Sequence, residues 1–91
     1  MNLKDEEKKR ELSLRLSRLE GQIHGINAML SSDRDCEEIL QQLAAAKSAT
    51  SRVTEIYLQY MFDVCLSTTE LKEGESSSEM MGKLVHMTLA Q

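Results

Sequence analysis

The chain has 91 residues, a formal net charge of −4 and no proline, and aromatic residues make up 3% of it. Leu, Met and Ala are plentiful and lose little or no side-chain entropy on a helix, so the composition predicts one small all-α domain over residues 1–91. No apolar run approaches the roughly 20 residues that span a bilayer. The charged start MNLKDEEKKRE differs from a signal peptide. We therefore expect a cytoplasmic protein without a membrane partner.

The first predicted element is a helix over residues 4–30. Gly21 and Gly25 lie four positions apart in it, which indicates close approach of another helix. Its apolar residues step by four and three positions, the heptad pattern of a helix that packs along a seam: Leu12, Leu16, Leu19, Ile23, Ile26 and Leu30.

The second predicted helix covers residues 33–66, with Ser32 or Asp33 as its N-cap after the polar break SSDRD. Its apolar residues form a stripe along the helix: Ile39, Leu40, Leu43, Ala46, Ala49, Val53, Ile56, Tyr57, Tyr60 and Val64. At ~1.5 Å per residue the helix is about 50 Å long, more than the width of a monomer of this size. A polar connector over residues 67–76 leads to a short third helix over residues 77–89. Three such helices cannot cover their own apolar faces, so we expect an obligate helical oligomer.

The two cysteines lie at opposite ends of the second helix. A helix places Cys36 and Cys65 about 43 Å apart, whereas a disulfide needs Cα atoms within about 7 Å. They can meet only if the second helices of two subunits pack antiparallel. Cys36 lies in the first helical turn, where the dipole and free amides favour a thiolate. The alternative is that both cysteines are small buried hydrophobic residues.

The stretch YMFDVC, residues 60–65, holds two sulfur side chains one helical turn apart. Met61 and Cys65 therefore share one face of the helix. This spacing is typical of a helix that presents two soft metal ligands, yet no histidine accompanies them. A metal site with a sulfur substitution, a reactive thiol site and ordinary core packing all remain open.

Basic residues gather in the first part of the chain despite the negative net charge. Residues 1–52 hold nine Lys and Arg against nine acids, and residues 53–91 hold two against six. A local basic face, not the net charge, is what a polyphosphate partner would meet.

Two stretches resemble a known family. RLSRLEGQIHGINAML and DRDCEEILQQLAAAKSA, followed by Cys65, are similar to the CsoR-type (copper-sensing operon repressor) family over about residues 8–89. The resemblance implies an all-α dimer with an antiparallel four-helix core, and dimers that pair into a disc-shaped tetramer. It also implies binding to operator DNA without a helix-turn-helix, with an inducer at two inter-subunit sites releasing the DNA.

The resemblance assigns DNA contacts as well. The basic positions of the family match Arg15 and Arg52. We expect further phosphate contacts from four more basic residues: Arg18, Lys47, Lys8 and Lys9. Contacts of this kind supply salt-dependent affinity and register.

Departures from the family pattern bear on the inducer. The resemblance implies that copper sensors hold Cu(I) with two cysteines and a histidine, and this chain has Met61 at the histidine position. Copper sensors also tend to carry a tyrosine before the first cysteine and a glutamate in the third helix, where this chain has Asp35 and Met81. These departures argue against copper.

The other branches of the family are distinguished in the same way. Nickel and cobalt sensors use additional histidines, whereas this sequence contains only His24 and His86 and neither stands at position 61. Formaldehyde sensors carry a proline where this chain has Asn2. The persulfide-sensing branch keeps both cysteines and lacks the histidine, so it fits best.

We therefore predict a repressor that needs no cofactor and is released by persulfide or polysulfide. Cys36 would attack the sulfur donor, and Cys65 of the partner subunit would close a bridge between subunits. The alternative is a Cu(I)-responsive repressor with a Cys36, Met61 and Cys65 site, because thioethers are soft ligands. No catalytic base, oxyanion donor or cofactor motif accompanies the cysteines, so we expect no enzymatic activity.

Overall fold

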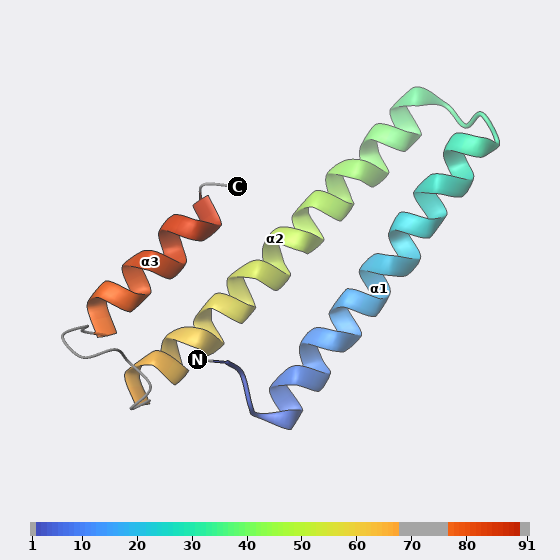
Figure 1. Cartoon of the computed structure of the whole chain (residues 1–91). Coiled ribbons are helices and arrows are strands. Elements are labelled where there is room, and N and C mark those ends of the chain that lie inside the picture. The colour runs from blue at the N-terminus through green and yellow to red at the C-terminus, as the bar shows by residue number, and fades with distance from the viewer. Residues whose placement is uncertain (1, 68–76, 90–91) are drawn as a thin grey trace.

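The computed structural model describes residues 2–67 and 77–89 and contains three helices, α1 (Glu6–Ser31), α2 (Cys36–Ser67) and α3 (Ser77–Leu89). Figure 1 shows α1 and α2 as a long antiparallel hairpin, with α3 beside the C-terminal half of α2. No strand occurs in these described ranges, so the predicted all-α class is confirmed. None of the described helices is both long and apolar enough to cross a membrane.

The helix boundaries differ slightly from those predicted. The helices predicted over 4–30 and 33–66 occupy Glu6–Ser31 and Cys36–Ser67, and the third spans Ser77–Leu89, as predicted. Residue 67 belongs to α2 and not to the connector, and the rest of that predicted connector, 68–76, lies outside the described residues. α2 is a single unbroken helix of 32 residues, which is the feature on which the cysteine argument depends.

Short polar side chains fix both ends of the turn between α1 and α2. Ser32 caps the C-terminus of α1, where its amide donates to the carbonyl of Ala28. Asp33 has a φ of 56°, a left-handed conformation that aspartate tolerates better than most residues. The carboxylate of Asp35 accepts a hydrogen bond from the amide of Glu37 at 3.1 Å. The predicted N-cap at Ser32 or Asp33 is therefore wrong, and Asp35 serves that end of α2.

The core lies where α1 begins and α2 ends. Four side chains are less than 9% exposed there and pack together: Leu3, Leu12, Ile56 and Met61. Leu3 precedes α1, so the segment before the helix folds back onto the hairpin. The start of α1 is fixed by Asp5, whose side chain accepts hydrogen bonds from the amides of Glu7 and Lys8.

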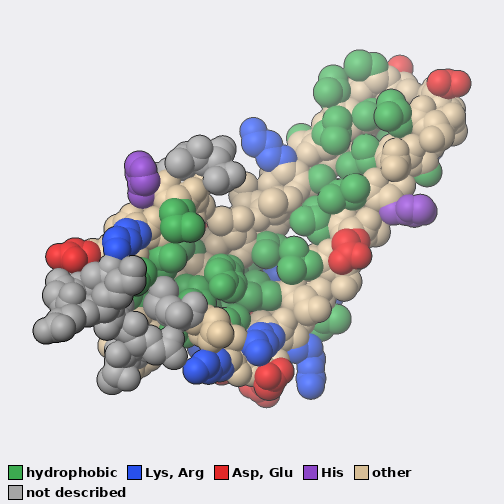
Figure 2. All heavy atoms as spheres, in the orientation of Figure 1, with side chains coloured by type: hydrophobic (Ala, Val, Ile, Leu, Met, Phe, Trp, Pro, Cys, Tyr) green, Lys and Arg blue, Asp and Glu red, His purple; other side chains and the backbone are tan. Residues whose placement is uncertain are grey.

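Much of the apolar stripe of the hairpin stays uncovered within one chain. The Cα extents are 55 × 28 × 14 Å, so the molecule is about one helix thick in its thinnest direction. Hydrophobic side chains line the face seen in Figure 2 along α1 and α2. Several predicted seam or stripe residues are exposed by about half: Leu16 (45%), Ile23 (54%), Leu30 (63%), Leu40 (59%) and Leu43 (48%).

Gly21 and Gly25 do not mediate a close helix contact within the chain. A Cβ atom at either position would meet nothing within 4 Å. The close approach expected there therefore has no counterpart within this single chain, and the predicted dimer and tetramer stay predictions.

The burial pattern makes a stability test possible with two leucines of one helix. Leu12→Ala removes a side chain that is 6% exposed and should lower the free energy of unfolding by about 2–4 kcal/mol. Leu14→Ala removes one that is 54% exposed and should cost much less at low protein concentration. Urea unfolding followed by circular dichroism measures both, and equal losses at every protein concentration would contradict this core.

Candidate sensing and DNA-binding sites

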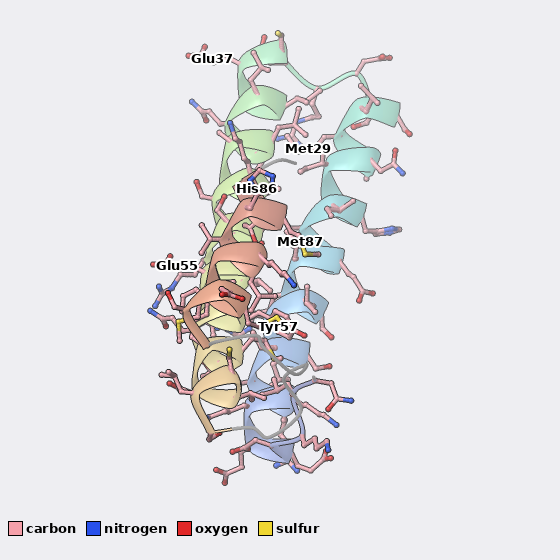
Figure 3. All side chains as sticks on the ribbon, turned by 60° about the vertical axis from the view of Figure 1, so that its left-hand side comes forward. Met29, Glu37, Glu55, Tyr57, His86 and Met87 are labelled. Atoms are coloured by element: carbon pink, nitrogen blue, oxygen red, sulfur yellow. The ribbon has the colours of Figure 1, made fainter. Side chains whose placement is uncertain are left out.

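Cys36 is the first residue of α2 and is exposed. It follows the capping residue Asp35 and precedes two acids, Glu37 and Glu38, in the first turn of the helix. Figure 3 labels Glu37 at the end of α2 that lies farthest from α3. The thiol of Cys36 is therefore open to solvent, or to a second subunit, at one end of the hairpin.

Cys65 lies near the other end of α2 and is fully buried, with 0% exposure. Met61, one helical turn earlier, is 3% exposed and belongs to the core cluster with Leu3, Leu12 and Ile56. Both sulfur side chains of the YMFDVC stretch therefore lie inside the fold. For Met61 this is the behaviour of a core residue, which the sequence left open.

The two cysteines cannot meet within one chain. Because α2 is continuous from Cys36 to Ser67, the 29-residue offset corresponds to about 43 Å along the helix axis. In addition, no group of three His, Cys, Asp or Glu side chains within the described residues is arranged to hold a metal ion. Any site that uses Cys36 and Cys65 together must therefore combine two chains.

Three arginines from two helices share one shallow groove between α1 and α2. Arg15 and Arg18 come from α1 and Arg52 from α2, and the groove encloses about 170 Å³. The remaining lining residues are Leu19, Gln22, Ala49 and Val53. The groove thus brings together three of the six basic residues that the sequence proposed for DNA.

Acidic residues lie beside two of these guanidinium groups. Glu11 lies 3.6 Å from Nε of Arg15, and Glu55 lies 3.3 Å from a terminal nitrogen of Arg52. Both pairs are largely exposed, so each contributes little to stability. Each of the two arginines thus has an acidic neighbour and remains exposed to solvent.

The three predicted lysine contacts lie elsewhere. Nζ of Lys8 lies 5.0 Å above the ring centroid of Tyr60, which is a cation–π contact. Lys9 pairs with Glu6 at 3.5 Å. Lys47 lines a separate hollow that α2 forms with Thr88 of α3. Lys and Arg side chains gather at the end of the molecule where α1 begins (Figure 2).

Tyr60 joins the end of α2 that carries Cys65 to α1, a contact that was not anticipated from the sequence. Its hydroxyl donates a hydrogen bond to the carboxylate of Glu11, 49 residues away. This bond, helped by desolvation and by the charge of Glu11, raises the pKa of Tyr60 above its ordinary value. No local spacing signal links two residues so far apart, so only the fold reveals the pair.

The two histidines are exposed, and both are more than ten residues from either cysteine in the sequence. His24 is exposed on α1, and His86 is exposed on α3. Figure 3 shows His86 near the far end of α3, and it lines a hollow of about 610 Å³ that also includes Met61 and Met87.

The chain is similar to known proteins over most of its length. A family model described as "Metal-sensitive transcriptional repressor" matches residues 8–87. The chain belongs to this family. It is 33% identical to the copper-sensing transcriptional repressor CsoR of Bacillus subtilis, over 82% of this chain and 73% of that protein.

Two further relatives are repressors of Mycobacterium tuberculosis. CsoR is 32% identical over 91% of this chain and 71% of its own length, and the copper-sensing repressor RicR is 34% identical over 84% and 76%. The protein is therefore a transcriptional repressor of the CsoR type and not an enzyme. All three relatives are named as copper-sensing repressors.

The hydrogen bond between Tyr60 and Glu11 predicts how the stability of this repressor depends on pH. The folded protein holds the proton of Tyr60 more tightly than the unfolded chain does. The hydrogen bond therefore contributes to stability below pH 10.0, the ordinary pKa of tyrosine, and this contribution is lost as the pH rises through the raised pKa of the folded state. Ultraviolet titration should show one of the two tyrosines ionising late, and Glu11→Gln should lower that pKa. Tyr57→Phe is the control and should leave the late transition intact; its loss in that variant would contradict the assignment.

Proposed function

We propose that this repressor binds operator DNA through the arginine groove and releases it when an inducer joins Cys36 of one subunit to Cys65 of the partner subunit. The observation that supports this proposal is the unbroken α2, which carries one cysteine at each end about 43 Å apart. Two antiparallel copies of α2 would place each exposed Cys36 beside the buried end that carries Cys65. A dimer would then hold two equivalent sites, and two dimers could form the tetramer.

The arginine groove suits the DNA backbone. Arginine guanidinium groups bind phosphates with two parallel hydrogen bonds, and three of them in one groove concentrate positive charge on a chain that is negative overall. We assign the phosphate contacts first to Arg15, Arg18 and Arg52. Lys8, Lys9 and Lys47 lie outside the groove and would extend the contact surface.

Copper(I) is the inducer that the relatives favour, because those named here are copper sensors. The residues that would hold it are Cys36 of one subunit with Met61 and Cys65 of the other. Two thiolates and a thioether form a soft donor set, and Cu(I) prefers soft ligands. Met61 and Cys65 are both almost fully buried, so their sulfur atoms are shielded from competing water.

Persulfide or polysulfide is the second candidate, and the core packing of Met61 favours it. A chemical inducer of this kind needs no third ligand, so Met61 can remain with Leu3 and Leu12. The thiolate of Cys36 attacks the outer sulfur of a persulfide RSSH, giving Cys36–S–SH and RS⁻. The thiolate of Cys65 of the partner subunit then attacks the Cys36 sulfur, forms a disulfide and expels HS⁻.

Either inducer must favour the form that does not bind DNA. A hundredfold loss of DNA affinity corresponds to about 2.7 kcal/mol of coupling free energy, within the usual allosteric range. One cross-link per site, acting on the packing of two long helices, is sufficient for an effect of this size.

Salt dependence tests the DNA contacts. Arg15→Ala and Arg52→Ala should each reduce the slope of log Kd against log salt by about 1, since each removes a phosphate contact. Fluorescence anisotropy with DNA from upstream of the protein's own gene measures the slope. The matched control is Arg34→Ala, which removes an arginine paired with Glu38 at 2.9 Å at the start of α2. An equal reduction in Arg34→Ala would show only a general charge effect.

Inducer-dependent release separates the two candidates. If Cu(I) is the inducer, Cu(I) should release the DNA and Met61→Leu should weaken Cu(I) binding, with Met80→Leu on α3 as the methionine control. If polysulfide is the inducer, release should persist in Met61→Leu and disappear in Cys65→Ser. Mass spectrometry should then find a Cys36–Cys65 cross-link between chains. Modification of Cys65 before Cys36 would contradict the proposed order of attack.

A further inference from the structure

One carboxylate in the hairpin has partners on both helices. One oxygen of Glu11 accepts the hydroxyl of Tyr60 from α2, and the other lies 3.6 Å from the guanidinium of Arg15 on α1. Nζ of Lys8 lies over the ring of the same tyrosine. Tyr60 is thus linked directly to Lys8, and through Glu11 to Arg15, two of the residues assigned to phosphate binding.

The tyrosine also belongs to the sensing part of α2. Tyr60 precedes Met61 and packs, half-buried, against the core cluster that contains Met61. Cys65 follows within little more than one helical turn on the same rigid helix. A displacement of this end of α2 relative to α1 must therefore lengthen or break the bond between Tyr60 and Glu11.

We infer that Tyr60 is a positioning residue that couples the sensing end of α2 to the DNA groove through Glu11 and Arg15. This inference rests on the proposed function, because it uses the same inducer site and the same DNA contact. With the bond intact, one oxygen of Glu11 is occupied by Tyr60 and the carboxylate attracts Arg15 only weakly. When an inducer moves this end of α2, both oxygens become free to bind the guanidinium.

The freed carboxylate competes with the DNA phosphate for Arg15. A bidentate pair between guanidinium and carboxylate is stronger than a single contact at 3.6 Å, so the release of Tyr60 lowers the affinity of Arg15 for phosphate. Coupling is reciprocal, so DNA bound at Arg15 favours the Tyr60–Glu11 bond and disfavours the inducer to the same extent.

The test is a double-mutant cycle on DNA affinity and on release. Tyr60→Phe keeps the ring, its packing and the Lys8 contact, and removes only the hydroxyl. We expect it to weaken DNA binding without inducer by about three- to tenfold, the range of one hydrogen bond. We also expect the ratio of Kd with and without inducer to fall by a similar factor, with Cu(I) and polysulfide as separate probes.

Glu11→Ala completes the cycle. It removes the competing carboxylate, so DNA binding should equal or exceed that of the wild type, and adding Tyr60→Phe should then change nothing. Tyr57→Phe removes a hydroxyl from the same helix and Glu20→Ala removes an exposed acid from α1, and both should leave the ratio unchanged. Circular dichroism confirms that each variant is folded.

The outcomes separate this inference from the proposed function. If neither probe releases DNA from the wild type, the proposed inducers are wrong. The double-mutant cycle on DNA affinity alone still decides whether Tyr60 acts on Arg15 through Glu11. If the wild type responds and Tyr60→Phe shows the same affinity and the same ratio, the inference is overturned. Additive effects of Tyr60→Phe and Glu11→Ala would overturn it as well.

Discussion

The length of α2 is the constraint from which the other properties follow. A helix of 32 residues without a break separates its two cysteines by about 43 Å. It also extends the hairpin into a layer about one helix thick, so one chain leaves many of its apolar residues exposed. The same constraint therefore leaves Cys36 without access to Cys65 in its own chain and leaves a long hydrophobic surface uncovered. A second antiparallel copy would satisfy both needs at once.

The arginine groove lies near the middle of α2, at a distance from both cysteines. Arg52 lies 16 residues after Cys36 and 13 residues before Cys65, which at ~1.5 Å per residue is about 24 Å and 20 Å. Two antiparallel helices would thus place each groove at a similar distance from both inducer sites. Neither proposed site would touch the arginine groove directly, so release from the groove would proceed through a change in helix packing. The Tyr60–Glu11 bond lies between the groove and the Cys65 end of α2, so a change in the packing of α2 on α1 would alter this bond.

The sequence was sufficient for the parts of the fold that depend on local periodicity. The heptad steps of α1 and the long apolar stripe of α2 predicted both helices to within three residues at each end. The cap of α2 was misassigned because Ser32, Asp33 and Asp35 are all good capping residues, and the choice depends on the backbone of the turn, where Asp33 adopts a positive φ.

The parts that depend on contacts between distant residues could not be predicted. Leu3 lies before the first helix and has no periodic partner, yet it packs against Met61. Likewise Glu11 looks like a solvated acid on α1, and only the packing of α1 on α2 places it against Tyr60. For the site, the sequence analysis proposed Arg15, Arg18 and Arg52 individually as DNA contacts, and their shared groove follows from the packing of the two helices.

Met61 shows how differently the two inducers would use the same core. If Met61 bound Cu(I) together with Cys36 of the partner subunit, the metal site would be built into the core cluster that Met61 forms with Leu3, Leu12 and Ile56. Since burying a methionine side chain contributes on the order of 1.5–3 kcal/mol, metal binding at this position would be coupled to the stability of the core. A persulfide requires only that the Cys65 end open toward Cys36, and it leaves Met61 in place. The two proposed inducers therefore differ in whether the core around Met61 changes when DNA is released. The presence of a sulfur atom at position 61 does not by itself distinguish them.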